Sequence, residues 1–337
     1  MFTGHRVLLT VYYSYMIRVG VLRGGISGEY DISLLTGGRV LSSLNKDKFV
    51  PVDLLITKDG EWHMNGLPVS GDKLKMSVDV VWNALHGHFG EDGKVQQFLD
   101  SLYIPYVGSG ALASAVAHNK LLARDRLKEL GYLVPKSRLI KYIDDDILDV
   151  VAKDVFMTIP PPWVVKPLSG GSSLDTFIAR TYDELIGALH ELKKRHQEIV
   201  IEEYIYGQEL WTGVIEHFRN KEHYTFPVHC VSTNEGMLCT HHRLSGEYLF
   251  YIPKDTPHDA KKNIENHAQR IHKELGLKGY SSVDFIENKK GLYVLEVDSQ
   301  PAFHEHSQFS KALESIGVSF GQFVESLIED TLGKNKK

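Results

Sequence analysis

Three carboxylates near the C-terminus fall in two neighbouring segments typical of a β-hairpin, YSSVDFIENKKGLYVLEVDS. Side chains alternate between the two faces of a strand, so Glu296 and Asp298 share one face of the second strand. The apolar faces of the two strands coincide when Asp284 lies directly opposite Glu296. The pattern therefore predicts three carboxylates that converge on one face of the hairpin.

This predicted register has further consequences along the hairpin. Phe285 pairs with Leu295, and Val283 pairs with Val297. The connection is then a three-residue loop, 289–291, whose final glycine suits the left-handed position of that turn type. The apolar pattern and the turn chemistry agree on the same register.

Carboxylates directly opposed in a sheet repel each other, so a positive charge is expected among them. Oxygen ligands on a rigid hairpin suit Mg²⁺, which takes few protein ligands and completes its shell with phosphate oxygens and water. The alternative is that one of the carboxylates is solvated at a strand end.

A glycine-rich loop follows the apolar strand that ends at Lys166, in the sequence WVVKPLSGGSSL. Its glycines and serines offer N–H and hydroxyl donors that could hold a phosphate, and the lysine would supply the charge. No G-K-[ST] precedes a helix, so this is not a Walker A loop. A glycine turn without function is the alternative interpretation.

Two polar loops near the N-terminus follow apolar strands, where α/β folds bind ligands. The turn GGISGE (24–29) does not match G-x-G-x-x-G, and Glu29 would repel a pyrophosphate but could hold an ammonium group. The loop HGHFGEDG (86–93) begins with His86 and is either a ligand loop or a polar capping loop. The triplet 304–306, His-Glu-His, lacks a second histidine cluster at zinc spacing, so a transition-metal site is not expected there.

The elements that position these groups alternate along the chain. A strand over 17–22, the glycine turn and an amphipathic helix begin an open α/β sheet, with further strands over 48–57 and 78–87. The pattern predicts one helix from Ala111 to about Gly131. It also predicts helices over 181–197, 259–277 and 320–332. The order is an α/β domain followed by two α+β pieces.

Composition narrows the class of protein. At roughly 150 residues per domain, 337 residues predict two or three domains. Apolar residues make up 42% and charged residues 24% of the chain, which excludes a wholly disordered or coiled-coil protein. A net charge of −5 without a basic run argues against nucleic acid as a partner. No 18-residue apolar stretch predicts a membrane span, and two cysteines fit a reducing cytosol. The first 16 residues lack a signal-peptide cleavage site and are expected to be an irregular extension.

Six motifs in order resemble the ATP-grasp superfamily and, within it, the D-alanine–D-alanine ligases: GGISGEYDISL, ALHGHFGEDGKVQ, IPYVGSGALASAVAHNK, VVKPLSGGSS, VIEEYIYGQEL and LEVDSQP. The resemblance runs from about Ile17 to the C-terminus. It implies an ATP-grasp fold of mixed α/β and α+β class. Its parts would be a Rossmann-like parallel-sheet substrate domain (16–110), a central subdomain with the glycine-rich loop (111–213) and a C-terminal subdomain with the metal-binding hairpin (214–334).

The resemblance also implies a reaction. Such ligases phosphorylate the carboxylate of one amino acid with ATP, and the amine of a second attacks the acyl phosphate to form a dipeptide. The implied cofactors are ATP and two Mg²⁺ ions, with Mn²⁺ as a substitute. D-alanine is the implied substrate, peptidoglycan precursor synthesis in the cytoplasm the implied role, and a homodimer the implied assembly.

Carried over motif by motif, the resemblance assigns roles to particular residues. On the nucleotide side, Lys120 and Lys166 would contact the phosphates, and Ser172 and Ser173 would lie in the phosphate-covering loop. The adenine-binding edge would be Glu202, Tyr204 and Ile205, and Glu209 would contact the ribose. On the reacting side, the metal ligands would be Asp284, Glu296 and Asp298. Glu29, with His86 nearby, would bind the ammonium group of the first substrate, and Ser307 would contact the second amino acid.

Four features depart from the family pattern. Ser282 stands where these ligases carry an oxyanion-stabilising arginine, Ala302 where they carry glycine, and Asp298 where they usually carry asparagine. The segment HHRLSGEYLFYIPKD has no clear counterpart of their substrate-covering loop, and Arg243 or Lys254 is a candidate for the missing charge. A ligase for other amino acids and a non-catalytic nucleotide- or amino-acid-binding protein are the alternatives. The glycine turn disfavours a dinucleotide-dependent oxidoreductase.

Overall fold

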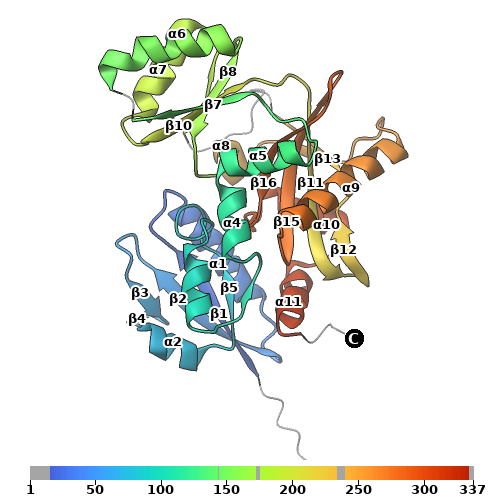
Figure 1. Ribbon diagram of the computed structural model, residues 1–337. Helices are drawn as coiled ribbons and strands as arrows, with labels where there is room; N and C mark the ends of the chain where they lie inside the picture. Colours follow the sequence, from blue (N-terminus) through green and yellow to red (C-terminus); the bar gives the residue numbers. More distant parts are fainter. Residues whose placement is uncertain (1–15, 143, 172–174, 234–239, 334–337) are drawn as a thin grey trace, which may run out of the picture.

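The computed structural model describes residues 16–142, 144–171, 175–233 and 240–333, which form three β-sheets with flanking helices (Figure 1). The predicted N-terminal extension, apart from Met16, lies outside these residues, and so do Ser172 and Ser173 of the glycine-rich loop. Within the described residues, no helix is long and apolar enough to cross a membrane.

The N-terminal sheet has the strand order β4-β3-β2-β1-β5-β6, and the strands β2, β1, β5 and β6 run parallel to one another. The strands are β1 (Ile17–Gly24), β2 (Phe49–Ile56), β3 (Trp62–Met64), β4 (Leu67–Pro68), β5 (Val80–Asn83) and β6 (Tyr106–Val107). The helices are α1 (Tyr30–Ser43), α2 (Gly71–Ser77) and α3 (Lys94–Ser101). Strand β1 is almost wholly buried because it pairs on both sides. The predicted glycine turn and polar loop follow β1 and β5 at the same edge.

The central sheet is antiparallel, in the order β7-β10-β8-β9. Its strands are β7 (Ser137–Lys141), β8 (Trp163–Pro167), β9 (Phe177–Ala179) and β10 (Glu198–Glu203). Its helices are the short η1 (Asp145–Ile147), then α6 (Leu148–Thr158) and α7 (Tyr182–Leu192). The helices α6 and α7 pack on the sheet face turned away from the C-terminal sheet, around the fully buried Trp163 (Figure 1).

The C-terminal sheet has the order β14-β13-β11-β15-β16, and β12 also pairs with β11. Its strands are β11 (Gln208–Phe218), β12 (Lys221–Thr225), β13 (His229–Ser232), β14 (Leu249–Tyr251), β15 (Tyr280–Asn288) and β16 (Gly291–Asp298). Its helices are α8 (Thr240–Ser245), α9 (His258–Glu274), α10 (Gln308–Ser315) and α11 (Phe320–Thr331). Strand β11 crosses the expected division at 213/214 and pairs with β15 from Gln208 to Ile215.

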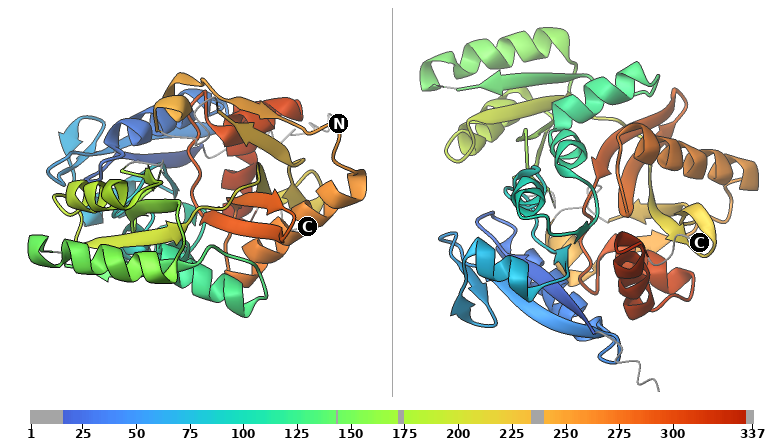
Figure 2. Two further views of the ribbon diagram at one scale, coloured as in Figure 1. Left: turned by 90° about the horizontal axis from the view of Figure 1, so that it is seen from above. Right: turned by 60° about the horizontal axis from the view of Figure 1, so that its bottom comes forward.

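One hydrophobic core joins the N-terminal and C-terminal sheets. The ring of Trp82 in β5 stacks on Tyr280 of β15 with centroids 6.0 Å apart, and Phe303 and Phe323 pack edge-on against the same indole. Helix α11 contacts α1, β5 and β6 and lies beside the N-terminal sheet (Figure 2). Because these side chains are buried together, the loops after β1 and β5 are held against the hairpin β15–β16.

The single helix predicted from Ala111 to Gly131 is wrong, because the segment forms two helices, α4 (Ala111–His118) and α5 (Lys120–Glu129). Asn119 between them has an extended backbone, and its side-chain oxygen accepts hydrogen bonds from the N–H groups of Leu121 and Leu122. Asparagine favours this N-cap position over a helix interior. The break makes Lys120 the first residue of α5.

The structure confirms the predicted register only at the open end of the hairpin, away from the turn. Asp284 lies opposite Glu296, as expected, but a β-bulge then shifts the pairing so that Phe285 faces Val294. Leu295 is the extra residue of the bulge. The predicted pairing of Phe285 with Leu295 is therefore wrong, and so is the three-residue loop, because Gly291 already pairs with Asn288 and leaves a two-residue turn.

Candidate active site

Two cavities meet between the three sheets, with about 1090 and 870 Å³ of empty space. We call the first the nucleotide-side cavity and the second the substrate-side cavity. Six residues line both cavities and form the wall that the cavities share: Gly170, Gly171, Arg243, Asp284, Glu296 and Gln308. A group transferred between molecules bound in the two cavities would pass this shared wall.

The nucleotide-side cavity lies between the central and C-terminal sheets. It is lined by every described residue that the sequence assigned to ATP: Lys120, Lys166, Glu202, Tyr204, Ile205 and Glu209. Apolar side chains also line it, among them Val164, Leu210, Ile286 and the bulged Leu295. The bulge thus removes Leu295 from the hairpin's core face and adds it to the cavity wall.

A buried carboxylate orients one of the two lysines. Glu202 Oε1 lies 3.0 Å from Lys166 Nζ and 2.6 Å from Arg124 Nη2. Burial raises the pKa of Glu202, but the charges of Lys166 and Arg124 outweigh burial and hold that pKa below its usual value. The ionised Glu202 therefore fixes the position of Lys166 at the cavity wall.

The second lysine connects the glycine-rich loop to the hairpin. Lys120 Nζ donates to the carbonyl of Gly170 and lies 3.7 Å from Glu296 Oε1. Burial would raise the pKa of Glu296, but Lys120, Lys166 and Arg243 hold it below the usual value. Cations thus gather where the two cavities meet.

Charge compensation is incomplete for the other two carboxylates of the hairpin. Burial raises the pKa of Asp284 to about 7, with the Arg243 charge opposing the rise and Glu296 adding to it. Burial and the neighbouring Glu91 raise the pKa of Asp298 to about 8. Closely placed carboxylates that resist ionisation are suited to a hard divalent cation, which would favour their charged forms.

The substrate-side cavity gathers the other assigned residues: Glu29, His86, Asp298 and Ser307. Glu29 Oε1 accepts a hydrogen bond of 3.2 Å from the N–H of Gly171, so the loop after β1 touches the glycine-rich loop. The Ser307 hydroxyl caps α10, accepting from the N–H of Ser310 and donating to its hydroxyl. His304 also lines the cavity, and burial lowers its pKa to about 4.

A largely buried carboxylate between two histidines was missed by sequence reasoning. Glu91 Oε1 lies 3.1 Å from His86 Nδ1, and its Oε2 lies 3.2 Å from His118 Nδ1. Burial alone would raise the pKa of Glu91, but the two histidines hold it well below its usual value. Both histidines have raised pKa values, because their contacts with Glu91 outweigh burial. The signal available was Glu91 itself, in the polar loop after β5, but its partner His118 comes from α4.

Two models of known protein families match this chain. A family model described as the D-ala D-ala ligase C-terminus matches residues 136–329, more than half of the chain. A second, described as the D-ala D-ala ligase N-terminus, matches residues 64–109. The chain belongs to the D-alanine–D-alanine ligase family.

Curated relatives of this ligase-family member cover nearly the whole chain. It is 32% identical over 322 residues to the D-alanine–D-alanine ligase of Beijerinckia indica subsp. indica, and the alignment covers 93% of this chain and 97% of the relative. It is 31% identical over 315 residues to the D-alanine–D-alanine ligase of Geobacter sulfurreducens, which spans 92% and 93%.

Solved structures of D-alanine ligases share the fold. The VanG D-Ala:D-Ser ligase from Enterococcus faecalis superimposes with a TM-score of 0.79 at 27% identity, over 95% of this chain and 100% of that one. The D-alanine–D-alanine ligase from Bacillus anthracis complexed with ATP gives a TM-score of 0.74 at 26% identity, over 95% and 99%. The expected ATP-grasp fold and the expected class of ATP-dependent, ADP-forming ligase are confirmed.

The four departures of this ligase-family member lie on the reacting side. Ser282 and Ala302 line the substrate-side cavity with Asp298, and Ser282 pairs with Asp298 across the hairpin. Arg243 of α8 reaches the shared wall, where its Nη1 donates to Gln308 Oε1 at 2.9 Å. Its Nε is buried and has no hydrogen-bond partner among the residues that the structure describes. Lys254 is exposed and lines neither cavity. Of the two candidate replacements for the family's arginine, only Arg243 therefore reaches the cavities.

Proposed function

We propose that this protein joins two amino acids at the expense of ATP, with D-alanine as both substrates, to supply peptidoglycan precursor synthesis in the cytoplasm. The observation that carries the proposal is the shared wall of the two cavities. Its charged residues would lie between the terminal phosphate of a nucleotide on one side and an amino-acid carboxylate on the other. The curated names of the relatives support the choice of D-alanine.

In the nucleotide-side cavity, Lys120 and Lys166 would contact the phosphates of ATP. Their position beside Gly170 and Glu296 supports this role, because phosphoryl transfer depends mainly on positioning and charge neutralisation. The segment 202–205 would contact the adenine, with the Glu202 carboxylate holding Lys166. Glu209 would bind the ribose, and its pKa is raised by burial, which suits a group that shares hydrogen bonds with hydroxyls.

Asp284, Glu296 and Asp298 would hold two Mg²⁺ ions, or Mn²⁺ in their place. The raised pKa values of Asp284 and Asp298 support a cation among these carboxylates. When bound, the ions would neutralise charge on the transferred phosphoryl group. Asp298 can serve where the family usually has asparagine, because a carboxylate oxygen is also a hard ligand.

In the substrate-side cavity, Glu29 would hold the ammonium group of the first amino acid and Ser307 would contact the second. Glu29 is buried beside the glycine-rich loop, so a substrate held by it lies next to the shared wall. His86 would stay positioned through Glu91, which also binds His118. The glycine-rich loop would exclude water, which otherwise hydrolyses an acyl phosphate.

Arg243 would stabilise the negative charge that develops on the acyl phosphate and on the tetrahedral intermediate. It lines both cavities, and its buried Nε has no hydrogen-bond partner within the described part of the chain, whereas Ser282 occupies the position of the family's arginine. In this chain the donor would therefore come from α8 rather than from β15.

The test is an amino-acid panel with purified protein and MgATP, read by phosphate release and mass spectrometry. D-alanine as the amino acid should yield the dipeptide, ADP and phosphate, and the phosphate carries away one carboxylate oxygen of the first alanine. D-serine belongs in the panel as second substrate, because the similar structure from Enterococcus faecalis is named a D-Ala:D-Ser ligase and Ala302 lies in the substrate-side cavity. ATP binding without phosphate release for any D- or L-amino acid would refute the ligase proposal.

A further inference from the structure

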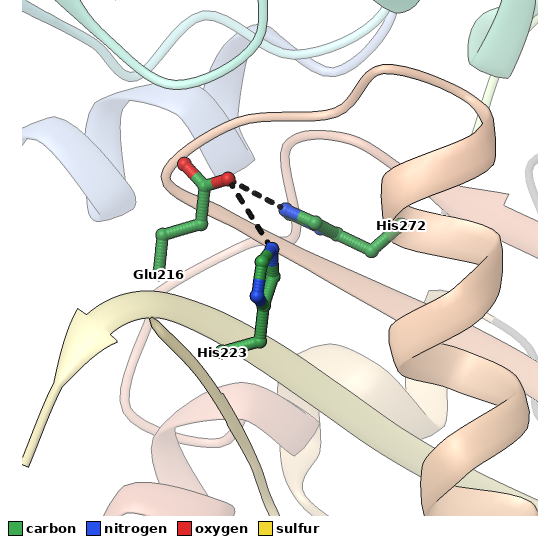
Figure 3. A group of neighbouring side chains, drawn as sticks. All are labelled: Glu216, His223 and His272. Atoms are coloured by element: carbon green, nitrogen blue, oxygen red, sulfur yellow. Dashed lines mark ion pairs between the residues drawn. The ribbon is translucent and has the colours of Figure 1, made fainter. Parts of the chain in front are cut away.

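Three metal-ligating side chains converge at a place that the ligase site does not use (Figure 3). They are Glu216 of β11, His223 of β12 and His272 of α9, and none lines the nucleotide-side or the substrate-side cavity. Their ligand atoms all lie within 4.8 Å of one another. The three elements are otherwise joined by packing of α9 against β11 and β12.

The outer atoms of Glu216 and His272 are held by other groups. Glu216 Oε2 accepts a 2.7 Å hydrogen bond from the N–H of Gly279. His272 Nδ1 lies 2.8 Å from the hydroxyl of the fully buried Ser281. With the proton on Nδ1, His272 presents a lone pair at Nε2, the arrangement seen in metal-ligating histidines whose other nitrogen is hydrogen-bonded.

The inner atoms lack ordinary hydrogen bonds. His272 is completely buried, and its Nε2 has no hydrogen-bond partner among the described residues. Glu216 Oε1 lies 3.5 Å from His272 Nε2 and 3.7 Å from His223 Nε2. Both separations exceed the usual N–H···O range of about 2.7 to 3.2 Å. A tetrahedral Zn²⁺ with ligands at about 2.0 to 2.1 Å would separate them by about 3.3 to 3.4 Å, close to what is observed.

We propose that Glu216, His223 and His272 bind one Zn²⁺ ion, with water as the fourth ligand, and that the ion ties α9 to β11 and β12. Two imidazoles and one carboxylate form a donor set typical of zinc. The site is separate from the magnesium-type carboxylates of the hairpin, and it does not depend on the ligase proposal.

The test measures zinc bound to the full-length protein after chelation, reloading with Zn²⁺ and dialysis against excess Mg²⁺. The magnesium competes for the hairpin carboxylates, so retained zinc reports the new site. We expect one equivalent of zinc in the wild type and in Glu296→Gln, the matched control that alters the other site. We expect loss of that equivalent in His223→Gln, whose side chain is only 8% exposed and whose folding is therefore checked by circular dichroism.

A second variant keeps the ligands and changes only their support. Ser281→Ala removes the partner of His272 Nδ1 and should weaken zinc binding about 10- to 100-fold. Zinc should also raise the melting temperature of the wild type but not of His223→Gln. Absence of retained zinc in the wild type, or undiminished binding in both His223→Gln and Ser281→Ala, would overturn the proposal.

Discussion

Replacing Arg243 by methionine should lower turnover with little change in the fold. The guanidinium lies where the two cavities meet, and its Nη1 donates a hydrogen bond to Gln308 Oε1. Methionine keeps most of the side-chain length but removes the charge and all donors. The expected effect is therefore on the reacting groups and not on the packing of α8.

The magnitude follows from the position of the charge. At about 4 Å and an effective dielectric constant near 20, two unit charges interact by about 4 kcal/mol. Arg243 is partly exposed to the cavities, so part of this interaction is screened. Loss of a comparable oxyanion donor lowers turnover by about 10² to 10³. We expect a fall of about 10²-fold in kcat, with a smaller change in KM for ATP.

The assay is steady-state phosphate release with D-alanine as substrate. Lys254→Met is the matched control, because it also removes one positive charge but from a residue that lines neither cavity. The double variant Arg243→Met/Ser282→Arg should recover part of the lost activity by supplying a guanidinium from β15. A kcat for Arg243→Met within about twofold of wild type, or an equal loss in Lys254→Met, would refute the role given to Arg243.

Three other predictions concern charge and stability. Glu91→Gln leaves two buried histidines without their carboxylate, so the free energy of unfolding should fall by about 3 to 5 kcal/mol in urea titrations, whereas an unchanged midpoint would contradict the contacts. Asp284 and Asp298 hold protons up to about pH 7 and 8 in the folded, metal-free protein, and the unfolded chain loses these protons near pH 4. The melting temperature without divalent ions should therefore fall as pH rises from 5.5 to about 8.5, and Mg²⁺ should reverse the fall. Asn119→Ala removes the cap of α5 and should cost about 0.5 to 2 kcal/mol of unfolding free energy, measured in urea.

Local patterns predicted much of the fold. The strands β1, β2, β5 and β8 and the helices α7, α9 and α11 overlap the ranges that the apolar periodicity predicted. The edge hairpin β3–β4 was not expected, because two- and three-residue strands carry too few residues to show a period. Helix α10 was also not expected. Asn119 was a readable signal, because asparagine is a strong N-cap, but the apolar spacing on either side of it hid the break.

The candidate site was predicted in part. Every assigned residue that the structure describes lines one of the two cavities, and Asp284 lies opposite Glu296 as the alternation required. The bulge at Leu295 was not predictable from alternation, since an inserted residue changes which side chains share a face. The partners Glu91 and His118 are 27 residues apart and meet only because α4 packs beside the loop after β5.

The sequence by itself determined what depends on neighbours along the chain: the period of each strand and helix, the glycine-rich turns and the carboxylates of the hairpin. The tertiary structure alone decided which distant groups meet. Arg243 reaches the shared wall through the placement of α8, and Glu216 meets His272 because α9 packs on β11. The physical reason is that periodicity and turn chemistry act over a few residues, whereas the burial of Trp82 against Tyr280 and its neighbours joins segments about 200 residues apart.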